Sequence, residues 1–189
     1  MSLPASKHIL IGGAALLVVL VLAVTQRRAI FNMMIAVDDA TLANKNVQAF
    51  LKMIRIGEGT SDALGYQRIY GSRSGAQFVD FSDHPRRSVT AAGITSTAAG
   101  AYQILRGTWD ELVSKYGFAD FSPHSQDLAA VALLKRRGAL LDVMEGRFDA
   151  AISKCAKEWA SLPGSPYGQP TVKLADARSN YQRFGGVIA

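Results

Sequence analysis

The chain has 189 residues and a formal net charge of +6 at pH 7. This length accommodates one compact domain with an appendage. The positive charge favours a polyanionic partner such as a nucleic acid, an anionic membrane surface or a cell wall. A single cysteine, Cys155, excludes an intramolecular disulfide, and three scattered histidines lack zinc-ligand spacing, so we expect no metal and no cofactor.

The N-terminal segment contains an uncharged apolar run, ILIGGAALLVVLVLAV, at residues 9–24, with basic residues on both sides. In length this run falls between the core of a signal peptide and a full membrane-spanning helix. Its paired glycines and alanines lower its hydropathy, and Thr25 stands where a cleavage site would carry alanine. We therefore expect residues 1–26 to form an uncleaved, weakly held transmembrane helix. A cleaved signal peptide and a buried core helix are the alternatives, and the flanking charges leave the orientation open.

The rest of the chain divides into a connector at residues 27–45, helical in its apolar part, and a globular domain at residues 46–189. Short alternations rich in glycine, serine and tyrosine predict a small hairpin between Gly65 and Phe81. Further helices are expected at roughly 98–116, from a Ser122 cap to just before Gly138, at about 149–160 and at about 172–184. The predicted fold class is α+β, mostly helical with a small β lobe.

The first helix of this domain leads to a candidate catalytic acid. Apolar residues recur at helical spacing from Val47 to Ile54, and Asn44 or Asn46 is placed to cap the helix. The glycines of GEGT at 57–60 end the helix and leave Glu58 at its C-terminal end. The helix terminus and nearby apolar groups disfavour the charged carboxylate, as a general acid near neutral pH requires. An ordinary surface glutamate in a helix-ending turn is the alternative.

Seven short blocks of the domain follow one another in a fixed order: EGT at 58–60, FSDHPRR at 81–87, STAAGAYQI at 96–104, DFSPHSQD at 120–127, RGAL at 137–140, ASLPG at 160–164 and YGQ at 167–169. In these blocks the chain resembles the lambda-type phage endolysins, a family of lytic murein transglycosylases. The resemblance covers about residues 46–184 and implies a lysozyme-like fold with Glu58 as catalytic acid. It also implies a sugar groove between the β lobe and the helical lobe.

The resemblance further implies a set of substrate-binding residues: Thr60, Tyr66, Asp83, His84, Tyr102, Gln103, Tyr167 and Gln169. An aromatic ring can stack on a pyranose face, and amides can bond hydroxyl and acetamido groups. Other interpretations stay open: Tyr102 fits a core aromatic, residues 167–169 fit a surface loop, and Asp83 with His84 fits a structural turn. The chain departs from the family pattern at Leu64, Gln67 and Phe81, which puts the roles of those positions in doubt.

A single candidate carboxylate favours transglycosylation. A hydrolase usually needs two carboxylates, and Gln67 stands where muramidases of the T4 type carry the second. In a transglycosylase the C6 hydroxyl of N-acetylmuramic acid is the nucleophile, so Glu58 alone would protonate the leaving oxygen and then accept the hydroxyl proton. We therefore expect cleavage of the MurNAc–GlcNAc β-1,4 bond of peptidoglycan to 1,6-anhydromuramoyl ends, for host cell lysis. The alternative is a hydrolytic muramidase in which Asp80 or Asp83 holds water.

The N-terminal segment resembles that of signal-arrest-release endolysins. We therefore expect the chain to be tethered in the host inner membrane by residues 9–24 and then released to the periplasm, with a holin or pinholin as partner. A non-catalytic wall-binding protein would have lost the acid, and nucleic-acid binding lacks a recognition motif. The basic run at 135–137 is expected to be a solvated helix end. Trp109, Trp159 and the Cys155 thiol are expected in the core.

Overall fold

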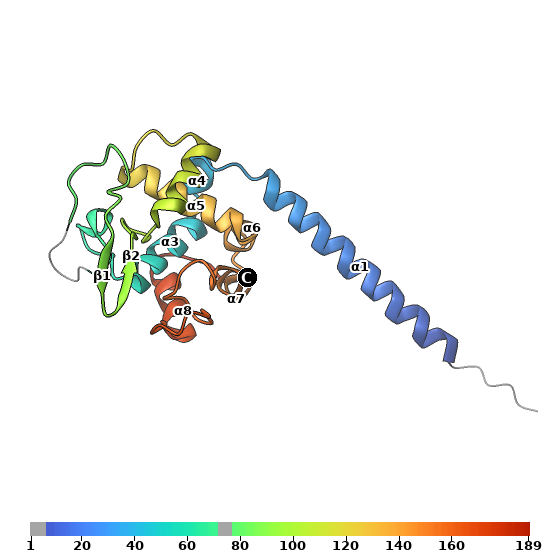
Figure 1. Ribbon diagram of the computed structural model, residues 1–189. Helices are drawn as coiled ribbons and strands as arrows, with labels where there is room; N and C mark the ends of the chain where they lie inside the picture. Colours follow the sequence, from blue (N-terminus) through green and yellow to red (C-terminus); the bar gives the residue numbers. More distant parts are fainter. Residues whose placement is uncertain (1–6, 72–76) are drawn as a thin grey trace, which may run out of the picture.

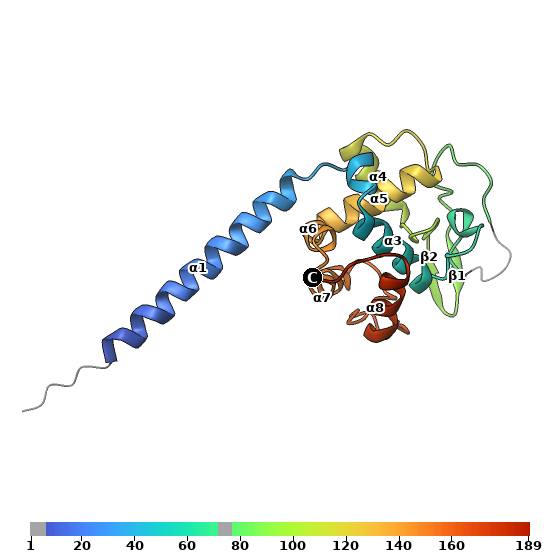
Figure 2. The same cartoon turned by 180° about the vertical axis from the view of Figure 1, so that it is seen from behind.

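The computed structural model describes residues 7–71 and 77–189, with side chains from residue 17 onward except that of Val19. Helix α1 (Lys7–Met34) projects as one rod away from the other elements, as Figures 1 and 2 show. It continues without a break through the boundary that the sequence suggested at residue 26. The apolar run predicted a transmembrane helix, but no helix among the described residues combines the length and the hydropathy needed to cross a bilayer.

The other elements follow in this order: α2 (Asp39–Leu42), α3 (Lys45–Gly57), η1 (Gly65–Gln67), β1 (Val89–Ala91), β2 (Ile94–Ser96), α4 (Arg106–Tyr116), α5 (Pro123–Arg136), α6 (Leu140–Met144), α7 (Phe148–Cys155) and α8 (Leu174–Arg183). Figure 1 shows the β hairpin on one side of α3 and helices α5 to α8 around the rest of it. The predicted α+β class, mostly helical with a small β lobe, is confirmed.

Helix α3 carries the centre of the core. Its cap is Asn44, whose side chain accepts hydrogen bonds from the backbone N–H groups of Asn46 and Val47. One face of the helix is buried between α5, α6 and α8, and Phe50 on that face packs edge-on against the rings of α7 and α8. The helix ends at Gly57, so the predicted boundaries are confirmed and Glu58 occupies the C-cap position.

The β hairpin lies later in the chain than the sequence suggested. Strands β1 and β2 pair antiparallel, with Val89 opposite Ser96. The two residues between them, Ala92 and Gly93, both have positive φ (48° and 79°), which matches the twist of a two-residue hairpin turn. Of the hairpin predicted over 65–81, the described residues show one isolated antiparallel bridge between Arg68 and Gln77, which follows the short helix η1; residues 72–76 lie outside the described structure.

The segment before α4 was also predicted incorrectly, as the start of a helix at residue 98. Gly100 and Gln103 have positive φ values of 77° and 48°, which a right-handed helix excludes. Ala99 and Ile104 instead exchange two backbone hydrogen bonds of 3.0 and 2.9 Å. The helix-forming alanines of this stretch are therefore held in a tight loop, and α4 begins only at Arg106.

Later in the chain, the Ser122 cap with Pro123 in the first turn and the final helix α8 agree with the predictions. Helix α7 ends at Cys155, earlier than predicted, and α6 was not predicted. Trp109 and Trp159 are 1% and 3% exposed and Cys155 is a buried free thiol, so these three residues lie in the core as expected.

Candidate active-site cleft

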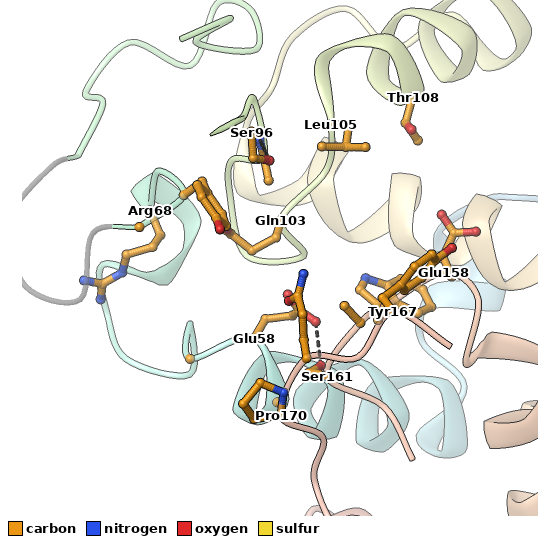
Figure 3. A pocket seen from close by; sticks show the side chains of 18 of the residues that line it. Glu58, Arg68, Ser96, Gln103, Leu105, Thr108, Glu158, Ser161, Tyr167 and Pro170 are labelled. Atoms are coloured by element: carbon orange, nitrogen blue, oxygen red, sulfur yellow. Dashed lines mark hydrogen bonds between the residues drawn. The ribbon is translucent and has the colours of Figure 1, made fainter. Parts of the chain in front are cut away.

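A cleft of about 1220 Å³ lies beside the C-terminal end of α3. Its lining residues fall within six stretches of the chain: 57–59, 68–71, 91–98, 103–108, 136–137 and 157–170. The hairpin therefore contributes one wall, and the ends of α3 and α5 with the segment after α7 contribute the other. Figure 3 shows Glu58 in the middle of this cleft, with Arg68 to one side and Glu158 and Tyr167 to the other.

Glu58 is half-buried at the point where α3 ends. The Ser161 hydroxyl donates a hydrogen bond of 2.5 Å to its Oε1, drawn as a dashed line in Figure 3. Burial raises the pKa of the Glu58 carboxyl above its usual range, and the hydrogen bonds from Ser161 offset part of this rise. The carboxyl group, which lines the cleft, therefore keeps its proton to higher pH than a free carboxyl group, and this shift favours a role as general acid.

The absence of a side chain at Gly57 brings Ser161 close to the end of α3. A Cβ at this position would lie 2.6 Å from the Ser161 Oγ and 3.1 Å from its Cβ. Gly59 turns the chain out of the helix with φ of 69°, and a Cβ there would meet no atom within 4 Å. The two glycines therefore have different roles. Gly57 leaves space for Ser161, the hydrogen-bond partner of Glu58, and Gly59 adopts the left-handed conformation that ends the helix.

Four of the nine predicted site residues line this cleft: Glu58, Gln103, Tyr167 and Gln169. The Gln103 side chain donates to the carbonyl of Gly100 at 3.0 Å, which fixes the loop that was predicted as helix. The Tyr167 hydroxyl donates to the carbonyl of Lys157 at 2.9 Å, while the residue stays 55% exposed. Its ring is thus held at the cleft with much of its surface free to contact a ligand.

Three other predicted residues lie behind the cleft rather than in its lining. Thr60 is fully buried and donates to the carbonyl of Ala101 at 2.6 Å. The hydroxyls of Tyr66 and Tyr102 both donate to Oδ1 of Asp127, at 3.0 and 2.6 Å. Burial and the Asp127 charge raise the pKa of Tyr66 to about 12, so both hydroxyls stay protonated as donors. Tyr102 is buried, in accord with the alternative interpretation of it as a core aromatic.

Asp83 and His84 line a separate hollow of about 300 Å³, together with Asp80. Asp83 accepts from Arg86 Nε at 2.6 Å and from the indole N–H of Trp109 at 3.0 Å. The Arg86 guanidinium lowers the pKa of the Asp83 carboxyl. His84 is buried and its Nε2 lies 2.9 Å from the carbonyl of Ile104; burial lowers its pKa. These contacts fit the structural-turn interpretation, and neither Asp83 nor His84 is among the described residues that line the larger cleft.

Sequence reasoning assigned no role in the site to Ser161, Glu158 or the two arginines of the 135–137 run. Arg136 and Arg137 lie at the partly exposed end of α5, as expected, but both also line the cleft and bind Glu158, which the sequence did not predict. Ser161 lies in the block ASLPG, which carried part of the resemblance and was the available signal. Within residues 7–71 and 77–189, no group of three or more His, Cys, Asp or Glu side chains is arranged to hold a metal ion.

The chain is similar to several known proteins. The endolysin family model matches residues 48–188. The endolysin of Escherichia phage lambda is 40% identical over 152 residues, with 77% of this chain and 94% of the relative covered. The endolysin of Escherichia phage P2 is 38% identical over 159 residues, with 77% and 96% covered.

Solved structures show the same similarity in three dimensions. Bacteriophage lambda lysozyme in complex with a chitohexasaccharide superposes with a TM-score of 0.72 at 39% identity, covering 77% of this chain and 97% of that one. A second structure of lysozyme from bacteriophage lambda gives a TM-score of 0.69 at 38% identity, with the same coverage.

Proposed function

The chain belongs to the endolysin family, and from this premise we propose that it cleaves the MurNAc–GlcNAc β-1,4 bonds of peptidoglycan by lytic transglycosylation, for lysis of a bacterial host. The predicted lysozyme-like fold agrees with the superposition on lambda lysozyme, which was solved with a bound chitohexasaccharide. One observation carries the proposal: Glu58 faces the cleft with a raised pKa and one neutral hydrogen-bond partner.

In this mechanism Glu58 acts twice. As an acid it protonates the glycosidic oxygen that leaves C1 of N-acetylmuramic acid. As the resulting carboxylate it accepts the proton of the C6 hydroxyl of the same sugar, whose oxygen attacks C1 and closes the 1,6-anhydro ring. The net reaction consumes no water. Because the nucleophile belongs to the substrate, the attack is intramolecular and has an entropic advantage over attack by a separate molecule.

The distribution of carboxylates supports transglycosylation over hydrolysis. Among the described residues, the acids that line the cleft are Glu58 and Glu158, and Glu158 is engaged by two arginines. Gln67 lies in η1 and does not line the cleft. Asp80 and Asp83, which the muramidase alternative would use to hold water, line the separate hollow. A hydrolase would need a second carboxylate free to activate water.

The products of digestion test this proposal directly. Purified protein would be incubated with peptidoglycan sacculi, and the soluble fragments would be identified by mass spectrometry and by a reducing-sugar assay. Transglycosylation predicts 1,6-anhydromuramoyl ends and no rise in reducing ends. Muramidase activity predicts reducing ends that are heavier by one water and that increase with each bond cut. The second result would overturn transglycosylation while leaving glycan cleavage intact.

We also propose that residues 9–24 hold the chain in the host inner membrane after export, and that its release to the periplasm brings the cleft to the wall. The basis is the weak apolar run between basic flanks. A holin or pinholin that collapses the membrane potential would be the partner that triggers release, because the potential helps to hold a charged exported chain in place. Cys155 is the single cysteine, so thiol exchange within the chain cannot be the switch.

Expression without other phage proteins tests the release step. Addition of an uncoupler should then cause lysis. A variant with four leucines added within residues 9–24 should lyse more slowly, because it costs more to withdraw from lipid. If that variant lyses as fast as wild type after uncoupling, a permanent anchor or a cleaved signal is the better account.

A further inference from the structure

One end of the cleft is basic, and the proposed cleavage reaction at Glu58 does not use these basic residues. Figure 3 shows Glu158 and Tyr167 together on the side of Glu58 away from Arg68. Around Glu158 the cleft is lined by Arg136, Arg137 and Lys157. A glycan strand of N-acetylated sugars is uncharged along its backbone, so its hydroxyl and acetamido groups do not require three cations.

Glu158 holds the two arginines in fixed positions. Its carboxylate is 8% exposed and accepts from Arg136 Nη2 at 2.7 Å and from Arg137 Nε at 2.6 Å. Arg137 is further fixed by a 2.9 Å hydrogen bond from its Nη2 to the carbonyl of Lys157. The side chains of the two arginines nevertheless stay about one third exposed, 36% for Arg136 and 32% for Arg137. They are therefore pre-organised and still accessible to a ligand.

The charges at this end do not cancel. Glu158 is the one acidic side chain among the residues that line this end in the described structure, against three cations. Glu111, which binds the other side of Arg136 at 3.0 Å, is 71% exposed and is not part of the lining. Lys157 is exposed, and its ammonium has no hydrogen bond or ion pair to any described residue. The surplus positive charge is therefore available to an anionic group.

We propose that this basic end binds the carboxylates of the peptide stem that muramic acid carries. The inference rests on the proposed cleavage of peptidoglycan. In that polymer the stem peptides are the source of negative charge next to the scissile bond, and they extend sideways from alternate sugars. The basic end lies in the same cleft as Glu58, so a stem on a sugar next to the scissile bond would be within the same binding site. The exposed parts of the two guanidinium groups and the Lys157 ammonium can each donate a charge-assisted hydrogen bond to a stem carboxylate, so this contact also helps to fix the register of the strand.

Three soluble substrates of equal strand length test the proposal. The first is glycan with intact stems, freed of cross-links by an endopeptidase. The second is the same glycan with the stem carboxylates converted to amides. The third is glycan stripped of its stems by an amidase, which leaves a lactyl carboxylate on each muramic acid, so the charge preference is taken from the first two substrates alone. The measured quantity is kcat/KM on each, and the charge preference is the ratio of the first to the second. We expect wild type to prefer intact stems over both other substrates, and this preference to weaken as salt increases.

Substitutions of the basic residues test whether the charge preference arises from this end of the cleft. In Arg136→Gln/Lys157→Gln the charge preference should fall about tenfold, because two partly exposed ion pairs each contribute roughly threefold. Lys157→Arg should keep the preference. Lys45→Gln/Lys52→Gln, an equal charge change at two exposed positions on α3 outside the cleft, is the matched control and should keep the wild-type ratio. If the double variant does not fold by circular dichroism, Lys157→Gln alone carries the test, because the described structure gives its ammonium no partner to lose.

The outcomes separate the two proposals. Equal cleavage of charged and amidated stems by wild type would overturn the inference and leave glycan cleavage standing. An unchanged ratio in the double variant would overturn it as well. A preference for either stem over stripped glycan, without a charge preference, would mean that the stem is bound through other contacts. If wild type cleaves none of the three substrates, the proposed function itself fails.

Discussion

Glu58 and Asp83 both lie in sequence blocks that carry the family resemblance, but the two carboxyl groups differ in burial and in hydrogen-bond partners. Glu58 is half-buried on the cleft, accepts a hydrogen bond from a neutral hydroxyl, and has a raised pKa because of burial. Asp83 lies beside α4, has a side chain that is 49% exposed, and accepts hydrogen bonds from Arg86 and Trp109 that lower its pKa. The role of a carboxyl group therefore cannot be assigned from residue type and motif alone. It depends on how far the group is exposed to solvent and on its hydrogen-bond partners.

This difference assigns the role of proton donor to Glu58 and the role of an ionised structural residue to Asp83. A proton on Glu58 can be donated in the cleft, whereas Asp83 stays ionised because a guanidinium is its closest partner. The muramidase alternative treats Asp83 as part of the chemistry, and the transglycosylase proposal treats it as a support for the fold. Substitutions at the two sites should therefore affect different observables: catalysis at Glu58 and stability at Asp83.

The largest effect is expected for Glu58→Gln. Loss of the proton donor should reduce kcat/KM on sacculi by at least the ~10²–10⁴-fold ascribed to general acid catalysis. The assay is clearing of chloroform-treated cells by purified protein, with circular dichroism as the control for folding. Retention of more than a tenth of the wild-type rate by a folded variant would remove Glu58 from the acid role.

The same substitution should change how stability depends on pH. The folded state of wild type raises the pKa of Glu58 above 4.5, so the folded protein binds more protons than the unfolded chain between the two values. The contribution of this group to stability therefore falls as pH rises from about 4.5 through the raised pKa. Glu58→Gln cannot ionise and should lack this fall. Urea unfolding over a pH series measures the difference, and identical pH profiles would argue that the site does not desolvate the carboxyl group.

Ser161→Ala should alter the pH dependence of activity more than its maximum. The hydroxyl of Ser161 lowers the pKa of Glu58 by donating to the carboxylate, so its removal should raise that pKa further. Since the acid must be protonated, the alkaline limb of the kcat/KM profile should move to higher pH. Ser165→Ala in the same segment is the control. A limb that moves to lower pH would contradict the assigned direction of the hydrogen bond.

Gly57→Ala should give a smaller shift in the same direction. The added Cβ would lie 2.6 Å from the Ser161 Oγ, so the hydroxyl must turn away from Glu58. Gly59→Ala is the matched control, because its Cβ meets nothing within 4 Å. Its positive φ should cost about 1 kcal/mol of stability without a change in the pH profile. Identical profiles for the two variants would show that Ser161 does not depend on the space at Gly57.

Asp83→Ala is expected to have the smallest effect on catalysis. The lost hydrogen bonds to Trp109 and Arg86 should lower the free energy of unfolding by about 1 kcal/mol, because both partners are near solvent. On the transglycosylase proposal, kcat/KM should change less than about threefold, within the range of indirect effects. Thermal melting and sacculus clearing give both quantities. A loss of activity comparable to that of Glu58→Gln would revive the muramidase alternative.

Local signals in the sequence predicted the parts of the fold that local chemistry determines. The Asn44 cap and the glycine-bracketed end placed α3 and therefore Glu58, and Ser122 with Pro123 placed the start of α5. The alanine-rich stretch before α4 was misread, because its loop depends on positive φ at Gly100 and Gln103 and on packing against Gln126. Helix propensity alone does not reveal such tertiary constraints.

The sequence predicted a site residue correctly where a local motif places that residue in the cleft, and failed where the position depends on a partner distant in the chain. Glu58, Gln103, Tyr167 and Gln169 line the cleft as the resemblance implied. Tyr66 and Tyr102 resemble ligand-binding aromatics in sequence, yet their hydroxyls are bound by Asp127 from α5, a partner distant in the chain. Arg136 and Arg137 read as a solvated helix end because Glu158, which holds them in the cleft, follows only after two further helices.

The junction between α1 and the domain has a mechanical consequence. Asn32 donates to the carbonyl of Lys135 and accepts from the N–H of Leu141, each at 3.2 Å, and Arg28 binds Glu145 at 2.8 Å. The rod is thus joined to the domain at several points rather than by a hinge. A helix of 28 residues is about 42 Å long. If these contacts persist when α1 tilts, the domain and its cleft would rotate with the helix, and the length of α1 would set the distance between its far end and the domain.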